Sequence, residues 1–198
     1  MSKRAKFVVL EGLDGVGKTT LASGLAEHYR GVHMDTPGER FTDIRSTVLT
    51  ALEEDQLGRA LFYAATVSAQ GRKARQIISS GQSVIMDRYW ASTIAYAKAR
   101  GVTANLDPLT LEFECPDVVV LITLDEQHRR TRLRKRGMTD EDHETLDSSF
   151  NQLVISELTS RCSVQVDVSG LDKDAAVVHV AHAIDTYIED FQECSQAQ

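Results

Sequence analysis

The sequence predicts an α/β fold in which helices cover both faces of a parallel sheet. Apolar runs with the length of strands alternate with helical stretches, which is the pattern of consecutive β–α units. The chain has 198 residues, of which 42% are hydrophobic, so it is long enough to bury one substantial core. We therefore expect a single domain over residues 1–198, with ligands bound at the carboxyl ends of the strands.

Each predicted strand is a short run rich in β-branched and other apolar residues. The five runs are Lys6–Glu11, Gly31–Asp35, Ser83–Asp87, Asp117–Leu124 and Ser163–Ser169. Because helical stretches separate them along the chain, they should pair in parallel within one five-stranded sheet.

The predicted helices show apolar residues at helical spacing or, in one case, a dense run of basic residues. One runs from the first glycine-rich turn to about Tyr29, and the others are Thr42–Glu54, Leu57–Ser80, Glu126–Arg136, Leu146–Ser160 and Asp174–Phe191. Gly137–Glu144 is polar and acidic, so we expect a loop there.

The glycine-rich turn after the first strand reads GLDGVGKT and fits the pattern GxxxxGK[ST] at every fixed position. Glycines let backbone N–H groups turn inward, and the start of the following helix adds partial positive charge for phosphates. This is a P-loop, in which Lys18 should reach the β- and γ-phosphates of ATP and the Thr19 hydroxyl should bind Mg²⁺. The predicted ATP-binding residues are Gly12, Leu13, Asp14, Gly15, Val16, Gly17, Lys18, Thr19 and Thr20.

Composition and missing motifs narrow the class of P-loop protein. The sequence has no guanine-reading NKxD motif, and the only DxxG after the third predicted strand stands near the chain end, at Asp167–Gly170. The net charge of -7 argues against general nucleic-acid binding, and no apolar run is long enough to span a membrane. The three cysteines are far apart and odd in number, which favours reduced thiols and a cytoplasmic location. A small phosphotransferase is the class that remains.

Two further segments complete the predicted site. Asp87 and Arg88 end the third strand beside the P-loop, where a carboxylate can hold Mg²⁺ and a guanidinium can clamp a phosphoryl oxygen. The basic helix carries Arg129, Arg130, Arg132, Arg134, Lys135 and Arg136. Followed by Gly137 and an acidic stretch, it is typical of a mobile lid over about residues 129–144 that brings cations to the transferring phosphate.

With these three pieces together, the chain resembles the thymidylate-kinase family of nucleoside monophosphate kinases. The segments VVLEGLDGVGKTT, VIMDRYWASTIAYA and PDVVVLITLDEQHRRTRLRKRG all have that family's pattern. More narrowly, DRYWASTIAYA, RALFYAA and RLRKRGM resemble the mitochondrial-type UMP–CMP kinase 2 branch of the family. The resemblance implies Mg²⁺ as cofactor, ATP and a pyrimidine nucleoside monophosphate as ligands, and a homodimer.

The resemblance also implies roles for individual residues. The implied catalytic residues are Asp14, Lys18, Arg88, Arg129, Arg132 and Arg136. The implied acceptor-binding residues are Pro37, Arg40, Arg45, Tyr63, Arg88, Ser92, Thr93 and Tyr96, with Tyr63 stacking on the base. The implied metal-binding residues are Thr19 and Asp87.

The identity of the acceptor stays open at this point. Thr66-Val67 replaces an Asp-Arg pair whose arginine helps bind thymidylate, so we interpret the acceptor as UMP, CMP, dUMP, dCMP or dTMP rather than dTMP alone. The alternatives are a dTMP-specific enzyme, a nucleoside kinase with Asp35 or Glu39 as base, and a nucleotide-binding protein without transfer activity. If Arg40 and Arg45 face the cleft, a phosphorylated acceptor is favoured; if Asp35 and Glu39 do, a nucleoside is favoured.

Overall fold

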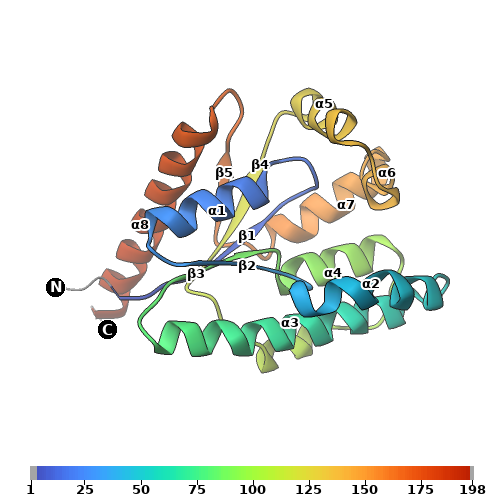
Figure 1. Ribbon diagram of the computed structural model, residues 1–198, viewed down its shortest axis with the longest axis horizontal. Helices are drawn as coiled ribbons and strands as arrows, with labels where there is room; N and C mark the ends of the chain where they lie inside the picture. Colours follow the sequence, from blue (N-terminus) through green and yellow to red (C-terminus); the bar gives the residue numbers. More distant parts are fainter. Residues whose placement is uncertain (1–3, 197–198) are drawn as a thin grey trace.

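The computed structural model describes residues 4–196, apart from the side chains of residues 140–141 and 192–196. Within this range, the strands form one parallel sheet in the order β2-β3-β1-β4-β5 (Figure 1). The strands are β1 (Phe7–Glu11), β2 (Val32–Asp35), β3 (Val84–Asp87), β4 (Val118–Thr123) and β5 (Val164–Asp167). Each predicted strand is confirmed, with ends that differ by one or two residues.

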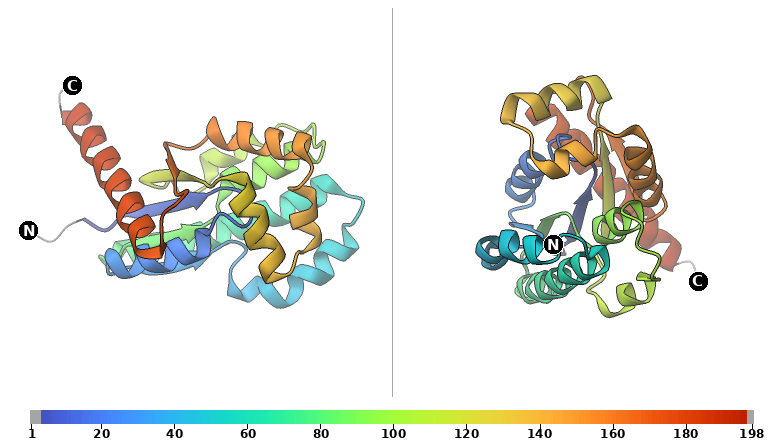
Figure 2. Two further views of the ribbon diagram at one scale, coloured as in Figure 1. Left: turned by 90° about the horizontal axis from the view of Figure 1, so that it is seen from above. Right: turned by 90° about the vertical axis from the view of Figure 1, so that its right-hand side faces the viewer.

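The helices pack on both faces of this sheet. They are α1 (Lys18–His28), α2 (Glu39–Ala51), α3 (Gln56–Ser79), α4 (Trp90–Ala99), α5 (Glu126–Arg136), α6 (Asp140–Glu144), α7 (Ser148–Thr159) and α8 (Lys173–Gln196), with a 3₁₀ turn over Asp107–Glu112. Helices α1 and α8 pack together on one face, and α3, α4 and α7 lie on the other (Figure 2). Of the helices described, none is both long and apolar enough to cross a membrane.

Two helices were not expected from the sequence. Helix α4 follows β3 directly, and its N-cap residue Tyr89 makes no side-chain cap, so the usual local start signal is missing. Helix α6 lies inside the segment predicted as a loop, and this prediction is wrong. Its start is fixed by a capping box, in which the Thr139 hydroxyl accepts from Asp142 N and Asp142 Oδ2 accepts from Thr139 N. The T-x-x-D pattern of Thr139–Asp142 is the sequence signal that predicts the start of this helix.

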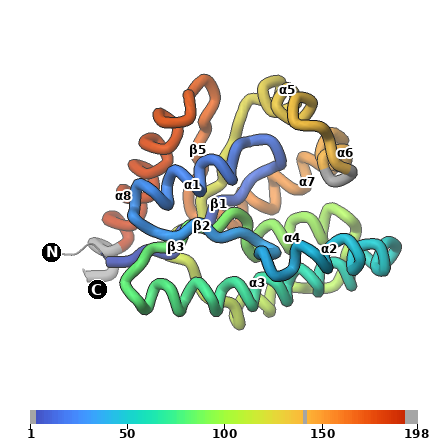
Figure 3. The backbone as a smooth tube through the Cα atoms, viewed as in Figure 1, coloured from blue at the N-terminus to red at the C-terminus, as the bar shows by residue number. Residues whose placement is uncertain are grey.

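The order of the strands brings the functional segments together. Strand β1 is central and pairs with β3, so that Leu10 lies opposite Asp87 in the register. Strand β3 also pairs with β2, where Asp35 lies opposite Asp87. The P-loop after β1 and the Asp87-Arg88 pair after β3 therefore meet at one end of the sheet, with α5 and α6 close by along the backbone trace (Figure 3).

Candidate active site

The P-loop curls around the start of α1. Its glycines Gly15 and Gly17 have a backbone in the left-handed region. Gly15 has φ 87, and a Cβ added there would lie 2.9 Å from the Leu133 side chain of α5. Any larger residue would push the P-loop and α5 apart. Behind the loop, Lys18 is 5% exposed, and its Nζ donates to Leu13 O at 2.9 Å. Burial, with help from the Arg88 charge, lowers the pKa of Lys18 to about 8.

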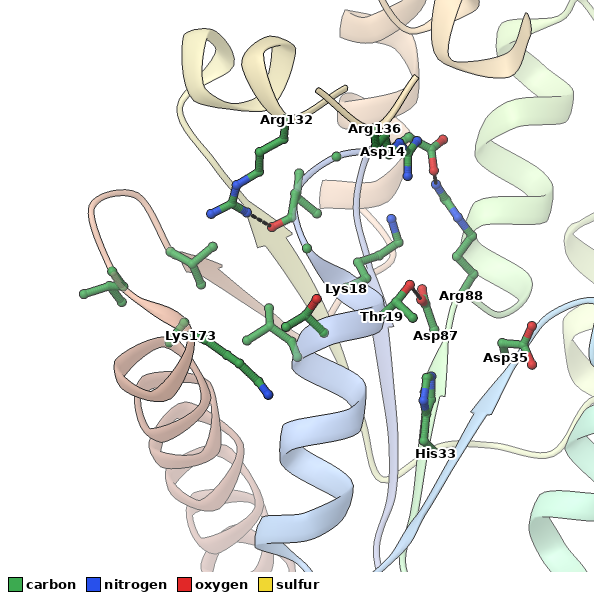
Figure 4. A pocket seen from close by; sticks show the side chains of 18 of the residues that line it. Asp14, Lys18, Thr19, His33, Asp35, Asp87, Arg88, Arg132, Arg136 and Lys173 are labelled. Carbon is green, nitrogen blue, oxygen red and sulfur yellow. Dashed lines mark hydrogen bonds and ion pairs between the residues drawn. The ribbon is translucent and has the colours of Figure 1, made fainter. Parts of the chain in front are cut away.

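Thr19 and Asp87 form a second polar pair at the start of α1. The Thr19 hydroxyl donates to Asp87 Oδ2 at 2.6 Å, while Asp87 Oδ1 is buried without a partner (Figure 4). The described residues contain no group of three or more His, Cys, Asp or Glu side chains able to hold a metal. A hydroxyl and a carboxylate oxygen fit Mg²⁺, which completes its oxygen shell with water and phosphate oxygens.

Arg88 is held in an uncommon backbone conformation, with φ 65. Its Nη2 donates to Asp14 Oδ1 at 2.8 Å, and its Nη1 donates to Ser92 Oγ at 2.9 Å. Burial alone would raise the pKa of Asp14, but the charges of Arg88 and Lys18 outweigh burial and hold that pKa well below its ordinary value. Asp14 is therefore a charged partner of Arg88 and a poor proton acceptor.

The basic helix α5 divides its arginines between two environments. Arg132 is exposed and donates to Val16 O of the P-loop at 3.1 Å. Arg136 is exposed and donates to Asp142 Oδ1 at 2.6 Å. Arg129 is instead 1% exposed, and its guanidinium bonds Glu126, Asp14 O and the Thr145 hydroxyl and carbonyl.

Two cavities meet at the Asp14–Arg88 pair. The P-loop cavity has a volume of about 750 Å³ and extends from the P-loop to the start of α8 at Lys173. The side cavity has a volume of about 420 Å³ and lies among α2, α3 and α4. Both are lined by Asp14, Thr36, Arg88 and Arg136. Groups bound in the two cavities would thus face each other across two guanidinium groups.

Most of the predicted acceptor-binding residues line the side cavity. They are Pro37, Arg45, Tyr63, Arg88, Ser92, Thr93 and Tyr96. Arg45 Nε donates to the Tyr63 hydroxyl at 3.1 Å, which ties α2 to α3 across this cavity. Arg40 is exposed and lines neither cavity, so the structure does not bring it to the site.

Two other residues that the sequence analysis singled out also lie away from both cavities. Val67 is fully buried between α3 and the sheet, among Phe7, Val9 and Met34. Val67, one of the two residues that replace the family's Asp-Arg pair, therefore packs in the core and lines neither cavity. Arg129 lines neither cavity and braces the P-loop against α5 instead of facing a ligand.

The P-loop is placed largely as expected. Asp14, Gly15, Val16, Gly17, Lys18, Thr19 and Thr20 line the P-loop cavity with Asp87, whereas Gly12 and Leu13 do not. Gly12 packs at the base of the loop, where an added Cβ would lie 2.5 Å from Ile122 O.

The sequence reading missed several residues of this site. Asp142 is fully buried and pairs with Arg136, and its only sequence signal was the capping box. His33 and Lys173 line the P-loop cavity from β2 and α8, and neither belongs to a recognisable motif. Glu11 is fully buried beneath Arg88, yet in the sequence it is merely the last residue of a strand.

Comparisons with known proteins agree with this geometry. The family model described as thymidylate kinase matches residues 10–166. A probable thymidylate kinase of Archaeoglobus fulgidus is 33% identical over 140 residues, covering 66% of this chain and 70% of that protein. A probable thymidylate kinase of Thermococcus kodakarensis is 34% identical over 154 residues, covering 68% of this chain and 74% of that protein.

Solved structures show the same fold. The thymidylate kinase of Candida albicans superimposes with a TM-score of 0.75 at 23% identity, covering 92% of each chain. The thymidylate kinase of Ehrlichia chaffeensis superimposes with a TM-score of 0.63 at 25% identity, covering 91% of this chain and 98% of that chain. The narrower resemblance to UMP–CMP kinase 2 gains no support from these relatives. The chain belongs to the thymidylate kinase family of nucleoside monophosphate kinases, phosphotransferases that use ATP with Mg²⁺.

Proposed function

We propose that this chain transfers the γ-phosphate of ATP to dTMP, which yields ADP and dTDP. One observation carries the choice of a phosphorylated acceptor: among the described residues, each carboxylate that lines the side cavity is already paired with an arginine. Asp14 pairs with Arg88 and Asp142 pairs with Arg136. The described lining of the acceptor cavity thus offers cations for a phosphate and no free carboxylate for removing a proton from a hydroxyl.

The two candidate bases of the nucleoside-kinase alternative do not line the side cavity. Asp35 lines the P-loop cavity and not the side cavity, and Glu39 is exposed and lines neither. Arg45, by contrast, lines the side cavity. A phosphate monoester has a second pKa of about 6, so it is already an oxyanion at neutral pH and needs no base.

The roles of the residues follow from their places at the two cavities. Lys18 and the P-loop N–H groups hold the ATP phosphates, and Arg88 and Arg136 hold the acceptor phosphate at the shared wall. Thr19 and Asp87 would hold Mg²⁺, which would supply positive charge at the transferring phosphate. Two polyanions repel each other, so alignment and neutralisation by these cations account for most of the catalysis.

Helices α5 and α6 are proposed to act as the lid, over about residues 129–144. Arg132 is exposed, and among the described residues its guanidinium donates to a P-loop carbonyl, so it can turn to a phosphate at small cost. Arg129 is assigned a bracing role, because its guanidinium is buried and bonded on all sides.

The choice of dTMP rests on the family and on the lining of the side cavity. The named relatives are thymidylate kinases, and the base end of the cavity includes the Tyr63 ring with the small side chains of Ala60 and Ala97. Such a lining accommodates a planar base that carries a methyl group. The broader acceptor set of UMP, CMP, dUMP and dCMP has no comparable support. The Candida albicans enzyme is described as having broad substrate specificity, so these acceptors belong in the test.

A coupled assay of ADP release from Mg·ATP tests the proposal. The acceptors are dTMP, dUMP, UMP, dCMP, CMP, AMP, GMP, the matching nucleosides, and none. We expect turnover to be fastest with dTMP and absent with nucleosides, and Lys18→Ala should abolish it. Turnover with nucleosides only would overturn the assignment of a phosphorylated acceptor. ATP binding without turnover of any acceptor would favour a nucleotide-binding protein.

The remaining expectations stay predictions. A homodimer is proposed through α3, where Leu57 and Leu61 are 41% and 47% exposed, and sedimentation velocity will test it. The single domain over residues 1–198 and the cytoplasmic location are likewise predictions.

A further inference from the structure

Glu11 is a fully buried carboxylate at the end of β1, directly before the P-loop. It lines neither cavity, so it cannot contact a ligand in either. Its Oε1 accepts hydrogen bonds from Tyr89 N at 3.0 Å and from Ser92 N at 3.1 Å. Its Oε2 accepts a short hydrogen bond from the Ser92 hydroxyl. Among the described residues, the donors to its carboxylate thus belong to the segment that follows Arg88.

These bonds make Glu11 the cap of helix α4. The N-cap residue Tyr89 supplies no side-chain cap, and the carboxylate from β1 satisfies two of the free N–H groups in its place. A negative charge at this end of a helix is also favoured by the helix dipole. The start of α4 is therefore fastened to the central strand of the sheet.

Arg88 lies in the chain between the end of β3 and the capped start of α4. Its N–H donates to Leu10 O at 2.9 Å, and its carbonyl accepts from the Thr36 hydroxyl at 2.9 Å. A positive φ is unfavourable for a residue with a long side chain, so the surrounding contacts must hold it. Glu11 holds the next residue along the chain, Tyr89, through its backbone N–H.

The Ser92 hydroxyl links Glu11 to the guanidinium of Arg88. Because its single proton is donated to Glu11, its oxygen is free to accept from Arg88 Nη1. The other side of the guanidinium bonds Asp14. The relay Glu11–Ser92–Arg88–Asp14 therefore has a fixed hydrogen-bond direction, in which the Ser92 hydroxyl donates to Glu11 and accepts from Arg88.

We propose that Glu11 is a positioning residue that aims the Arg88 guanidinium at the acceptor phosphate, through Ser92 and through the cap of α4. The inference rests on the proposed function, because it needs a phosphate in the side cavity. Glu11 acts through Arg88 and is not itself catalytic. Burial raises the pKa of Glu11, while the Ser92 hydroxyl and the Arg88 charge oppose that rise, so the two ends of the relay stabilise each other.

Glu11→Gln tests the relay with little change of shape. The amide oxygen still accepts from the two backbone N–H groups, but the amide nitrogen must donate to Ser92 Oγ and the hydroxyl proton loses its acceptor. Ser92→Ala removes the link from the other end, and gives a second route if Glu11→Gln does not fold. Glu27→Gln on the exposed face of α1 is the matched control.

The readout is the ratio of dissociation constants for thymidine and dTMP, measured by calorimetry, since this ratio isolates the contribution of the phosphate. We expect both relay variants to lower the ratio and kcat by about 10- to 100-fold. The affinity for ATP should stay unchanged in both variants, and the affinity for thymidine should stay unchanged in Glu11→Gln, whose side chain lines neither cavity. In an Arg88→Ala background, Glu11→Gln should have no further effect on the ratio, because the partner that it positions is gone.

The outcomes separate the inference from the function on which it rests. Equal loss of thymidine and dTMP binding would show a general structural role and would overturn the inference. A wild-type ratio in both relay variants would overturn it as well. If the wild-type protein itself bound thymidine as tightly as dTMP, the proposed function would fail, whatever the variants showed.

Discussion

The Thr19 hydroxyl and the Asp87 carboxylate are joined by a 2.6 Å hydrogen bond that leaves Asp87 Oδ1 buried and without a partner. A buried carboxylate oxygen with no donor is unfavourable unless a ligand satisfies it. In a P-loop protein that uses Mg²⁺, the hydrated cation is the natural partner. The pair thus marks where the two predicted metal-binding residues meet.

Asp87→Asn should weaken cation binding, because it removes the charge that faces the metal. We expect the affinity for Mn²⁺ in the presence of a non-hydrolysable ATP analogue to fall by about 10- to 100-fold, as measured by electron paramagnetic resonance. Asp35→Asn is the matched control, since Asp35 lies opposite Asp87 in the sheet and lines the same cavity. Equal effects of the two changes would contradict the assignment.

Arg129→Ala should reduce stability, because the guanidinium is 1% exposed and bonds groups of the P-loop and of the turn after α6. We expect the free energy of unfolding to fall by about 3 kcal/mol in denaturant titrations followed by circular dichroism. Arg134→Ala on the exposed face of α5 should change it by less than about 0.5 kcal/mol. Unchanged stability with a large loss of kcat would restore Arg129 to a catalytic role.

Arg132→Ala should have the opposite profile. Its side chain is exposed and lines the P-loop cavity, so stability should be unchanged while kcat falls by about 100-fold. Steady-state kinetics with saturating ATP separates an effect on kcat from an effect on the acceptor KM. An effect on the acceptor KM alone would remove Arg132 from the transition state.

Val67→Arg should destabilise the protein rather than alter acceptor choice. The side chain is 0% exposed in the core beneath α3, and a buried unpaired charge is expected to cost about 4 kcal/mol or more. Ala65→Arg places the same residue on the exposed face of α3 and should be tolerated. A stable Val67→Arg protein with a changed dTMP to UMP ratio would restore Val67 as a specificity residue.

Cys162 should react slowly with thiol reagents. Burial and the nearby Glu11 charge raise its pKa well above the ordinary value, so little thiolate is present at pH 8. In a Cys115→Ser, Cys194→Ser background, the rate of alkylation should rise about tenfold per pH unit between pH 7 and 9. A plateau below pH 8 would contradict the raised pKa.

Motifs made of contiguous residues could be predicted from the sequence. The residues that tertiary packing brings beside those motifs could not. The P-loop and the bounds of α5 follow from local patterns, and Lys18, Thr19 and Arg132, which those patterns single out, line the P-loop cavity. Arg129 and Arg132 look alike in sequence, and tertiary contacts of α5, such as the packing of Leu133 on Gly15, decide which arginine is buried. Val67 depends on how an alanine-rich helix is rotated about its axis, which its weak apolar pattern does not determine.

Glu11 shows a second limit of sequence reasoning. Its partners Tyr89 and Ser92 lie 78 and 81 residues away, so no local pattern reveals that it caps α4. The same distance explains why α4 itself was missed: its cap comes from another strand.

One competition experiment tests the central claim most directly. Equal amounts of dTMP, dUMP, UMP, CMP and thymidine are mixed with limiting radiolabelled Mg·ATP, and the labelled products are resolved by chromatography. Because the acceptors compete, the product ratio gives the ratio of their kcat/KM values. The account predicts that most of the label appears in dTDP. Label mainly in TMP, formed from thymidine, or in UDP and CDP would contradict it.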